Sequence, residues 1–323
     1  MDIITTQASL GGDVCRRPGP PVRALRGYFA ADTQRCLQTA LGLLWVLDGA
    51  LQFQSFMYSK GFIGMLSKLM NGEPRWLADT MQWGADIASG DLVLWNTLFA
   101  VAQVVLGLGI LYRPRVRSAL AASCLWTLIV WWFGEALGTL FMNTANPLTG
   151  APGAVSLYGL VALVVWPGSR PGGIIGSGGA RVAWAALWLV MAYLWLLGAN
   201  SGADATRNAI DAAPSGVTWL ATVQDWAATA AHGHGLAIAV VMALLSVVIG
   251  IGVAAMWHAR LLLWTAIGVN LVYWVLGQGL GGIFQGGATD PNAGLPFVLL
   301  AMAMFGALEP PRSPVPIVRP AVK

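Results

Sequence analysis

The feature that most constrains this chain is a series of long apolar segments that carry almost no charge. The stretch from Gly235 to Trp257, for example, contains no Asp, Glu, Lys or Arg. About 20 apolar residues cross the ~30 Å hydrocarbon core of a membrane as an α-helix, which satisfies its backbone hydrogen bonds internally. Only 10% of all residues are charged, against about 25% in ordinary soluble domains. The sequence therefore predicts an all-α, multi-pass membrane protein and excludes an ordinary soluble enzyme, a disordered chain and a secreted disulfide scaffold.

Eight transmembrane helices are predicted, in two units of four. The first unit, residues 37–168, holds the segments Leu37–Met57, Leu92–Tyr112, Ser118–Phe141 and Ala154–Trp166. The second unit, residues 181–309, holds Arg181–Ala199, Gly235–Trp257, Leu261–Phe284 and Leu295–Leu308. A Gly/Ser-rich linker, residues 169–180, separates the units, and the Pro/Arg-rich tails, residues 1–36 and 310–323, are predicted to be disordered. The first tail has no apolar core before a small-residue cleavage site, so it is not read as a signal peptide.

The basic residues indicate the orientation. With both termini in the cytoplasm, fourteen Lys and Arg side chains lie inside and only Lys60, Lys68, Arg75 and Arg207 lie outside. Cytoplasmic loops of membrane proteins carry this excess of basic residues. We therefore expect an inner (plasma) membrane protein with cytoplasmic termini. The net charge of +4 is too small to indicate nucleic acid, so the bilayer is the expected general partner.

The two predicted units repeat one another at a shift of 143 residues. The matching segments are Leu44-Trp45 with Leu187-Trp188, Trp76-Leu77-Ala78 with Trp219-Leu220-Ala221, Arg117 with Arg260, and Trp131 with Trp274. A unit with an even number of spans enters and leaves on one side, so the copies are expected to be parallel repeats about an axis along the membrane normal. The Trp-rich segment after each first span predicts a helix lying on the outer leaflet.

Polar side chains inside the first unit are the candidate site. A charge at the centre of a bilayer costs about 2.5–3.5 kcal/mol, and Asp48 and Glu135 both fall within predicted spans. Gln52 follows Asp48 by one helical turn, and the second span adds Asn96 and Gln103. The corresponding residues of the second unit are Met191, Trp195, Ala239, Ser246 and Gln278, the last replacing Glu135. This asymmetry favours a ligand-binding site in the first unit. The alternative, a hydrogen-bonded cluster that stabilises the bundle, stays open for the acids and is favoured for Asn96 and Gln103.

Three further patterns are weaker. Gly134/Gly138 and Gly277/Gly281 have the small-xxx-small spacing of closely packed helices, and no break is expected within the longer spans. His232 and His234 could share a metal ion, although two ligands are too few to define a site and interfacial histidines are the alternative. The loops before the short fourth and eighth spans, around Pro147 and Asp290, either fold back to roof a cavity or are ordinary surface loops.

The segments Leu43-Leu44-Trp45-Val46-Leu47-Asp48-Gly49 and Phe133-Gly134-Glu135-Ala136-Leu137-Gly138 carry a resemblance. Over about residues 37–310 the chain resembles a group of bacterial membrane proteins that are loosely DoxX-like, here with the four-helix unit duplicated. The resemblance implies a quinone as ligand and a membrane or extracytoplasmic redox protein as partner. Two other functions stay open: a transporter for a small solute or proton, with the acids as its ion sites, and a non-catalytic scaffold. No sequence motif decides whether the protein is an enzyme.

Overall fold

The computed structural model describes residues 32–168 and 170–308, and these residues form helices and connecting segments without a β-strand. The predicted all-α fold is confirmed for this part of the chain. The predicted tails lie outside the described residues, except that the first described helix already begins at Thr33, inside the predicted tail 1–36.

The first half of the described chain has ten helical elements. They are α2 (Thr33–Leu51), η1 (Ser55–Tyr58), α3 (Lys60–Met70), α4 (Arg75–Gly90), α5 (Leu92–Leu111), η2 (Arg113–Arg115), α6 (Val116–Phe133), η3 (Ala136–Thr139), η4 (Pro147–Thr149) and α7 (Ala154–Val164). The second half has α8 (Gly176–Trp195), α9 (Gly198–Ser201), α10 (Ala205–Asp211), α11 (Thr218–Ala231), α12 (Gly235–Ala254), α13 (Ala259–Leu276), η5 (Gly279–Gln285) and α14 (Gly294–Ala307). Both ends of α5 and of α6 precede the matching ends of α12 and α13 by 143 residues.

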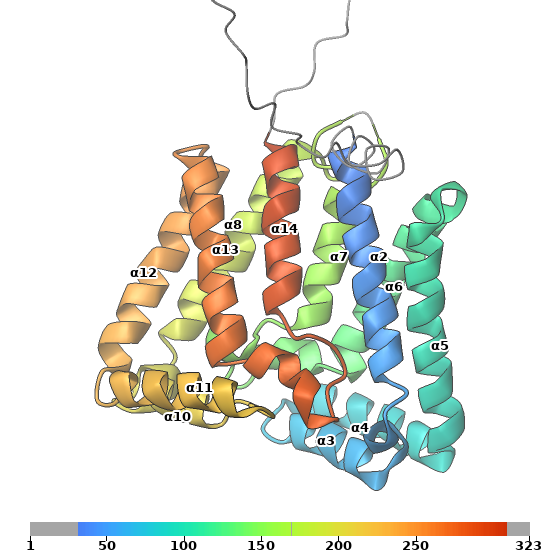
Figure 1. Cartoon of the computed structure of the whole chain (residues 1–323), viewed down its shortest axis with the longest axis horizontal. Helices are drawn as coiled ribbons and strands as arrows, with labels where there is room; N and C mark the ends of the chain where they lie inside the picture. Colours follow the sequence, from blue (N-terminus) through green and yellow to red (C-terminus); the bar gives the residue numbers. More distant parts are fainter. Residues whose placement is uncertain (1–31, 169, 309–323) are drawn as a thin grey trace, which may run out of the picture. The chain divides into compact units, whose positions relative to one another are not determined.

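The long helices run side by side, and α3, α4, α10 and α11 lie across one end of the bundle (Figure 1). The helix α2 begins, and α14 ends, at the opposite end (Figure 1). Four helical segments of the described residues are long and apolar enough to cross a membrane: Leu92–Leu111, Arg113–Phe133, Gly235–Ala254 and Ala259–Gln285. The helices α7 and α14 are apolar but shorter. The described chain therefore has the character of a multi-pass membrane protein.

The third and seventh predicted spans end earlier than expected. The helix α6 stops at Phe133, and Leu137 and Gly138 adopt positive φ angles of 54° and 69°. Likewise α13 stops at Leu276, and Leu280 and Gly281 have φ angles of 57° and 77°. The prediction of unbroken spans is wrong at both places, because left-handed backbone terminates an α-helix.

The predicted small-xxx-small helix faces are wrong for the same reason. Gly138 and Gly281 lie beyond the ends of their helices. A Cβ atom added to Gly138 would overlap the Pro152 carbonyl oxygen, and one added to Gly281 would meet the backbone of Pro291. The glycines do permit a close approach, but their partners are the segments that precede α7 and α14.

The first span begins earlier than predicted because polar residues in its first turns find partners. An Nη of Arg35 donates to the carbonyl oxygen of Ile110 at 2.8 Å, at the C-terminal end of α5. The Gln38 side chain donates to Val165 O at 2.8 Å, just after α7. Carbonyl groups at helix C-termini lack intrahelical donors, so these side chains bind the ends of two neighbouring helices to α2.

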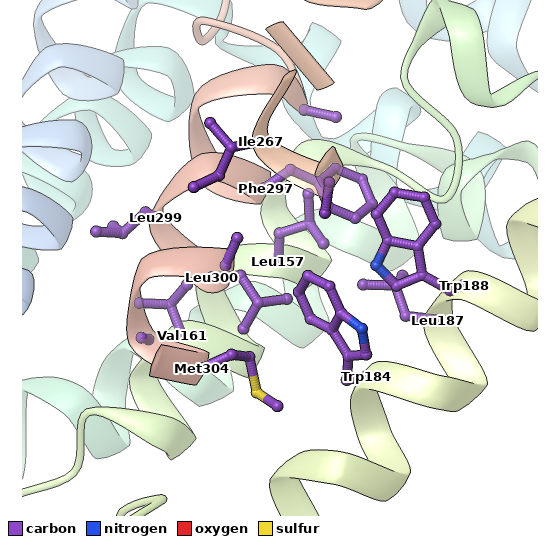
Figure 2. Close-up of a cluster of buried hydrophobic side chains, with 14 of the residues drawn as sticks. Leu157, Val161, Trp184, Leu187, Trp188, Ile267, Phe297, Leu299, Leu300 and Met304 are labelled. Atoms are coloured by element: carbon purple, nitrogen blue, oxygen red, sulfur yellow. The ribbon is translucent and has the colours of Figure 1, made fainter. Parts of the chain in front are cut away.

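The main core lies where α7, α8, α13 and α14 meet, so it joins the two halves. Figure 2 shows Leu157 and Val161 from α7, Trp184 and Trp188 from α8, and Phe297 from α14 packed together. The rings of Trp188 and Phe297 are 6.0 Å apart between centroids. The fourth helix of each half is thus buried at the centre, which leaves the remaining helices of the first half free to surround a second region.

Candidate functional site

A cavity of about 330 Å³ lies in the first half of the chain. Its walls come from α2, α3, α4, α5, α6 and α7, and residues 289–290, just before α14, complete it. Most of its lining is apolar, and polar side chains enter from α2, α5, α7 and the end of α6. A largely apolar cavity with a few convergent polar groups is the usual form of a small-molecule site.

Four of the five predicted site residues line this cavity: Asp48, Gln52, Gln103 and Glu135. Asn96 does not line it. Its side-chain amide instead donates to the backbone oxygen of Gln52 at 2.8 Å, at the C-terminal end of α2. Asn96 therefore connects α5 to α2, as the stabilising alternative predicts for this residue.

Asp48 is held by a hydrogen bond from another helix. The hydroxyl of Tyr158, on α7, donates to Asp48 Oδ1 at 3.2 Å. The Tyr158 ring packs edge-on against Trp45, with ring centroids 4.9 Å apart, and the indole N–H of Trp45 donates to Ser123 Oγ at 2.8 Å. Both Asp48 and Tyr158 are almost fully buried. The carboxyl group is therefore oriented by α7 at the wall of the cavity.

The two carboxyl oxygens of Glu135 have different environments. Oε1 accepts a hydrogen bond from the backbone N–H of Val155 at 3.1 Å, in the first turn of α7. Gln278 makes the equivalent bond in the second half, from Gly294 N to Oε1 at 2.9 Å. An amide can therefore perform this structural role. Oε2 of Glu135 is buried without a hydrogen-bond partner and is the atom that the structural role does not use.

The sequence reasoning missed two polar residues of the cavity, Tyr158 and Asp290. Asp290 belongs to the second half, where Thr289 Oγ1 donates to its Oδ2 at 2.7 Å and the backbone N–H of Asn292 donates to its Oδ1 at 2.6 Å. Of the two readings of this segment, the cavity roof describes its position. An acid beside a proline in a loop before a short span was the available signal, whereas nothing local distinguishes Tyr158.

Aromatic side chains form the wall between α5 and α6. The ring of Phe99 lies 6.1 Å from Trp95 and 6.1 Å from Trp126 between centroids, and all three rings line the cavity. Trp83 and Ile129 also line it, yet 62% of Trp83 and 40% of Ile129 are exposed on the outside of the bundle. The rim of the cavity thus reaches the lateral face formed by α4, α5 and α6.

The corresponding region of the second half is filled. Trp195 and Tyr273 occupy the positions that match Gln52 and Val130 at the 143-residue shift. Trp195 is 1% exposed and its indole N–H donates to the Tyr273 hydroxyl at 3.0 Å. Met191 replaces Asp48 and is fully buried. Space and acidic side chains therefore occur together in the first half and are both missing at the matching positions of the second.

The two candidate metal ligands lie on the surface, away from the cavity. His232 Nδ1 lies 2.7 Å from Asp204 Oδ1, and His234 Nδ1 lies 2.6 Å from the backbone oxygen of His232. Hydrogen bonds from the Gly233 backbone and from His232 lower the pKa of Asp204. Within residues 32–168 and 170–308, no three His, Cys, Asp or Glu side chains are grouped as a metal site requires.

Comparison of the chain with models of protein families, with curated proteins and with solved structures finds no match. The functional argument therefore depends on the cavity and its residues.

Proposed function

We propose that the chain crosses the plasma (inner) membrane eight times, as two tandem parallel four-helix units with cytoplasmic termini. The recurrence of helix bounds at 143 residues supports the two units. The basic residues support the orientation, because seven described ones lie toward the end where α2 begins: Arg35, Arg113, Arg115, Arg117, Arg170, Arg181 and Arg260. Only Lys60, Lys68, Arg75 and Arg207 lie toward the other end.

We infer further that the protein binds a lipid-soluble small molecule in the cavity of the first unit. The observation that carries this proposal is the contrast between the halves, since a cavity lined by acids stands where the second half has a filled, neutral core. Interiors are normally close-packed, so a fold that can fill this position and leaves it open in one copy has a use for the space. A scaffold does not require such a cavity.

A quinone is the ligand that the DoxX-like resemblance implies, with a separate redox protein as its electron donor or acceptor. The aromatic wall of Trp95, Phe99 and Trp126 suits a planar ring. The two carbonyl oxygens of a quinone need hydrogen-bond donors, which the Tyr158 hydroxyl and the side-chain amide of Gln103 would supply. The protein would bind and orient the ring, and electron transfer would be the chemistry of the quinone itself.

The test is to identify what the cavity retains. The protein would be purified in mild detergent and its bound small molecules analysed by mass spectrometry, alongside a variant whose cavity is filled. Gln52→Trp copies Trp195 of the second half and should lose the bound molecule. Leu43→Trp places the same ring on the exposed face of α2 (Leu43 is 55% exposed) and should retain it. Equal ligand content in both variants would contradict the proposal.

A transporter is the second candidate, because α6 and α13 are broken at matching positions. Glu135 and Gln278 lie directly at these breaks. Paired helix breaks are typical of substrate and ion sites in transporters, and the expectation of unbroken spans had counted against this function. Proteoliposomes carrying the protein should then accumulate substrate or protons across a gradient, and Glu135→Gln should abolish the accumulation. Binding without any transmembrane flux would exclude this candidate.

A further inference from the structure

The cavity carries several acidic side chains without a basic one. Asp48, Glu135 and Asp290 line it, and they come from α2, the end of α6 and the segment before α14. Within the part of the chain that the structure describes, no Lys, Arg or His contributes to the lining. Buried carboxylates are normally paired with a positive group, so the missing counter-charge is a property that a ligand can supply.

The unpartnered atoms of the cavity point to the same chemistry. Oε1 of Gln52, Oε1 of Gln103 and Oε2 of Glu135 are buried and receive no hydrogen bond. Gln52 and Gln103 are only 7% and 6% exposed, and both line the cavity. These three atoms are acceptors as placed, and buried polar groups in native proteins are usually satisfied. A ligand that donates hydrogen bonds satisfies them, whereas one that only accepts does not.

The walls suit a positively charged ligand with an apolar body. Trp45, Trp83, Trp95 and Trp126 all line the cavity. The faces of tryptophan rings attract cations, and recognition of ammonium groups commonly uses such aromatic surfaces. The lateral rim at Trp83 and Ile129 offers an entrance from the membrane, where an apolar cation concentrates.

The second half provides an internal comparison. Its counterparts of Asp48 and Glu135 are Met191 and Gln278, and its counterpart of the cavity is filled by Trp195 and Tyr273. Gln278 keeps the hydrogen bond to the following helix. The fold thus needs neither negative charge at these positions, and the charge is present only where there is room for a ligand.

We propose that the ligand of the cavity is an organic cation, an ammonium or similar group on an apolar body, and that Asp290 of the second half is one of its binding residues together with Asp48 and Glu135. This inference rests on the proposed function, namely that the cavity is a ligand site, and replaces the quinone by a different ligand class. Thr289 and the Asn292 backbone orient the Asp290 carboxylate toward this role through the two hydrogen bonds described above.

The experiment compares two probes of the same shape and opposite charge. Binding of tetraphenylphosphonium and of tetraphenylborate to the purified full chain in detergent would be measured by equilibrium dialysis, with decylubiquinone as a neutral probe. We expect saturable binding of tetraphenylphosphonium at one site per chain and no saturable binding of tetraphenylborate. Glu135→Gln and Asp290→Asn should each weaken the cation at least tenfold. Asp79→Asn, which removes an exposed charge on α4, should leave the affinity unchanged.

Both cavity variants preserve the fold by design. Glutamine makes the Glu135 hydrogen bond at Gln278, and asparagine can accept the hydrogen bonds that Asp290 accepts. Equal binding of the two charged probes, or full cation affinity in both variants, would overturn the cation inference. Saturable binding of decylubiquinone without the cation would also overturn it while leaving the proposed function in place. Failure of all three probes to bind the folded chain would count against the cavity as a ligand site and so against both.

Discussion

Trp195 and Gln52 occupy matching positions, but their truncation should have very different costs. Trp195 is 1% exposed and packs against Tyr273 with ring centroids 5.9 Å apart. Replacing a fully packed tryptophan by alanine typically costs about 3–5 kcal/mol, because the surrounding atoms lose their dispersion contacts. The Tyr273 hydroxyl also loses the indole donor, which is part of that cost. We therefore expect Trp195→Ala to lower the free energy of unfolding by about 3–5 kcal/mol.

Gln52→Ala should change the same free energy by less than about 1 kcal/mol. The Gln52 side chain borders an existing cavity, and its Oε1 has no hydrogen-bond partner, so removing it breaks no intramolecular side-chain bond. The bond that Asn96 donates ends on the Gln52 backbone oxygen and survives the substitution. The assay is reversible unfolding by SDS titration in mixed micelles. Equal costs for the two variants would refute the contrast between a filled and an open position.

A smaller partner variant refines the measurement. Tyr273→Phe keeps the ring and removes the hydroxyl that accepts from Trp195 at 3.0 Å. The loss should be about 1 kcal/mol, the usual net value of one hydrogen bond. In the double variant with Trp195→Ala the hydroxyl no longer has a donor to lose, so the two effects should not add. Strict additivity would show that the two side chains do not interact.

Three other predictions concern topology, a buried acid and a strained glycine. Reporter fusions at Gly172 should report cytoplasm and fusions at Asp211 the outside; a periplasmic signal at Gly172 would contradict the two-unit topology. Burial raises the pKa of Glu73, whose oxygens have no partner, so Glu73→Gln should raise the melting temperature at neutral pH, with the gain vanishing below the ordinary pKa of 4.5, where the folded and unfolded carboxyl groups are both protonated. Gly138→Ala forces a side chain into a φ of 69° against a backbone carbonyl and should cost at least about 1–3 kcal/mol, whereas Gly64→Ala, with open space around it, should not destabilise the protein in the same unfolding assay.

The helical plan could be predicted from the sequence because it depends on local composition. Runs of apolar residues without charge must form helices in lipid, and their spacing gave the starts of α5, α7 and α12 as the structure has them. The ends of α6 and α13 could not be predicted in this way. Apolar residues continue beyond both ends, and the chain leaves the helix only because Gly138 and Gly281 meet segments that come later in the chain.

Part of the candidate site was likewise visible in the sequence. Asp48 and Glu135 stand out because a charge within a span is costly, and comparison of the two halves marks them as features of the first. Sequence alone could not separate a structural from a functional role, and the structure divides them by atom in Glu135 and assigns Asn96 to the support of α2.

The sequence by itself determined that this is an all-helical chain of membrane character whose helix pattern recurs after 143 residues, because hydropathy and spacing are properties of neighbouring residues. Only the tertiary structure decided that α6 and α13 break, that Tyr158 orients Asp48, and that Asp290 of the second half completes a cavity in the first. These features depend on contacts between residues more than 100 positions apart, such as Tyr158 with Asp48 at a separation of 110. No local pattern specifies such contacts, since they arise only when the two halves pack around their shared core.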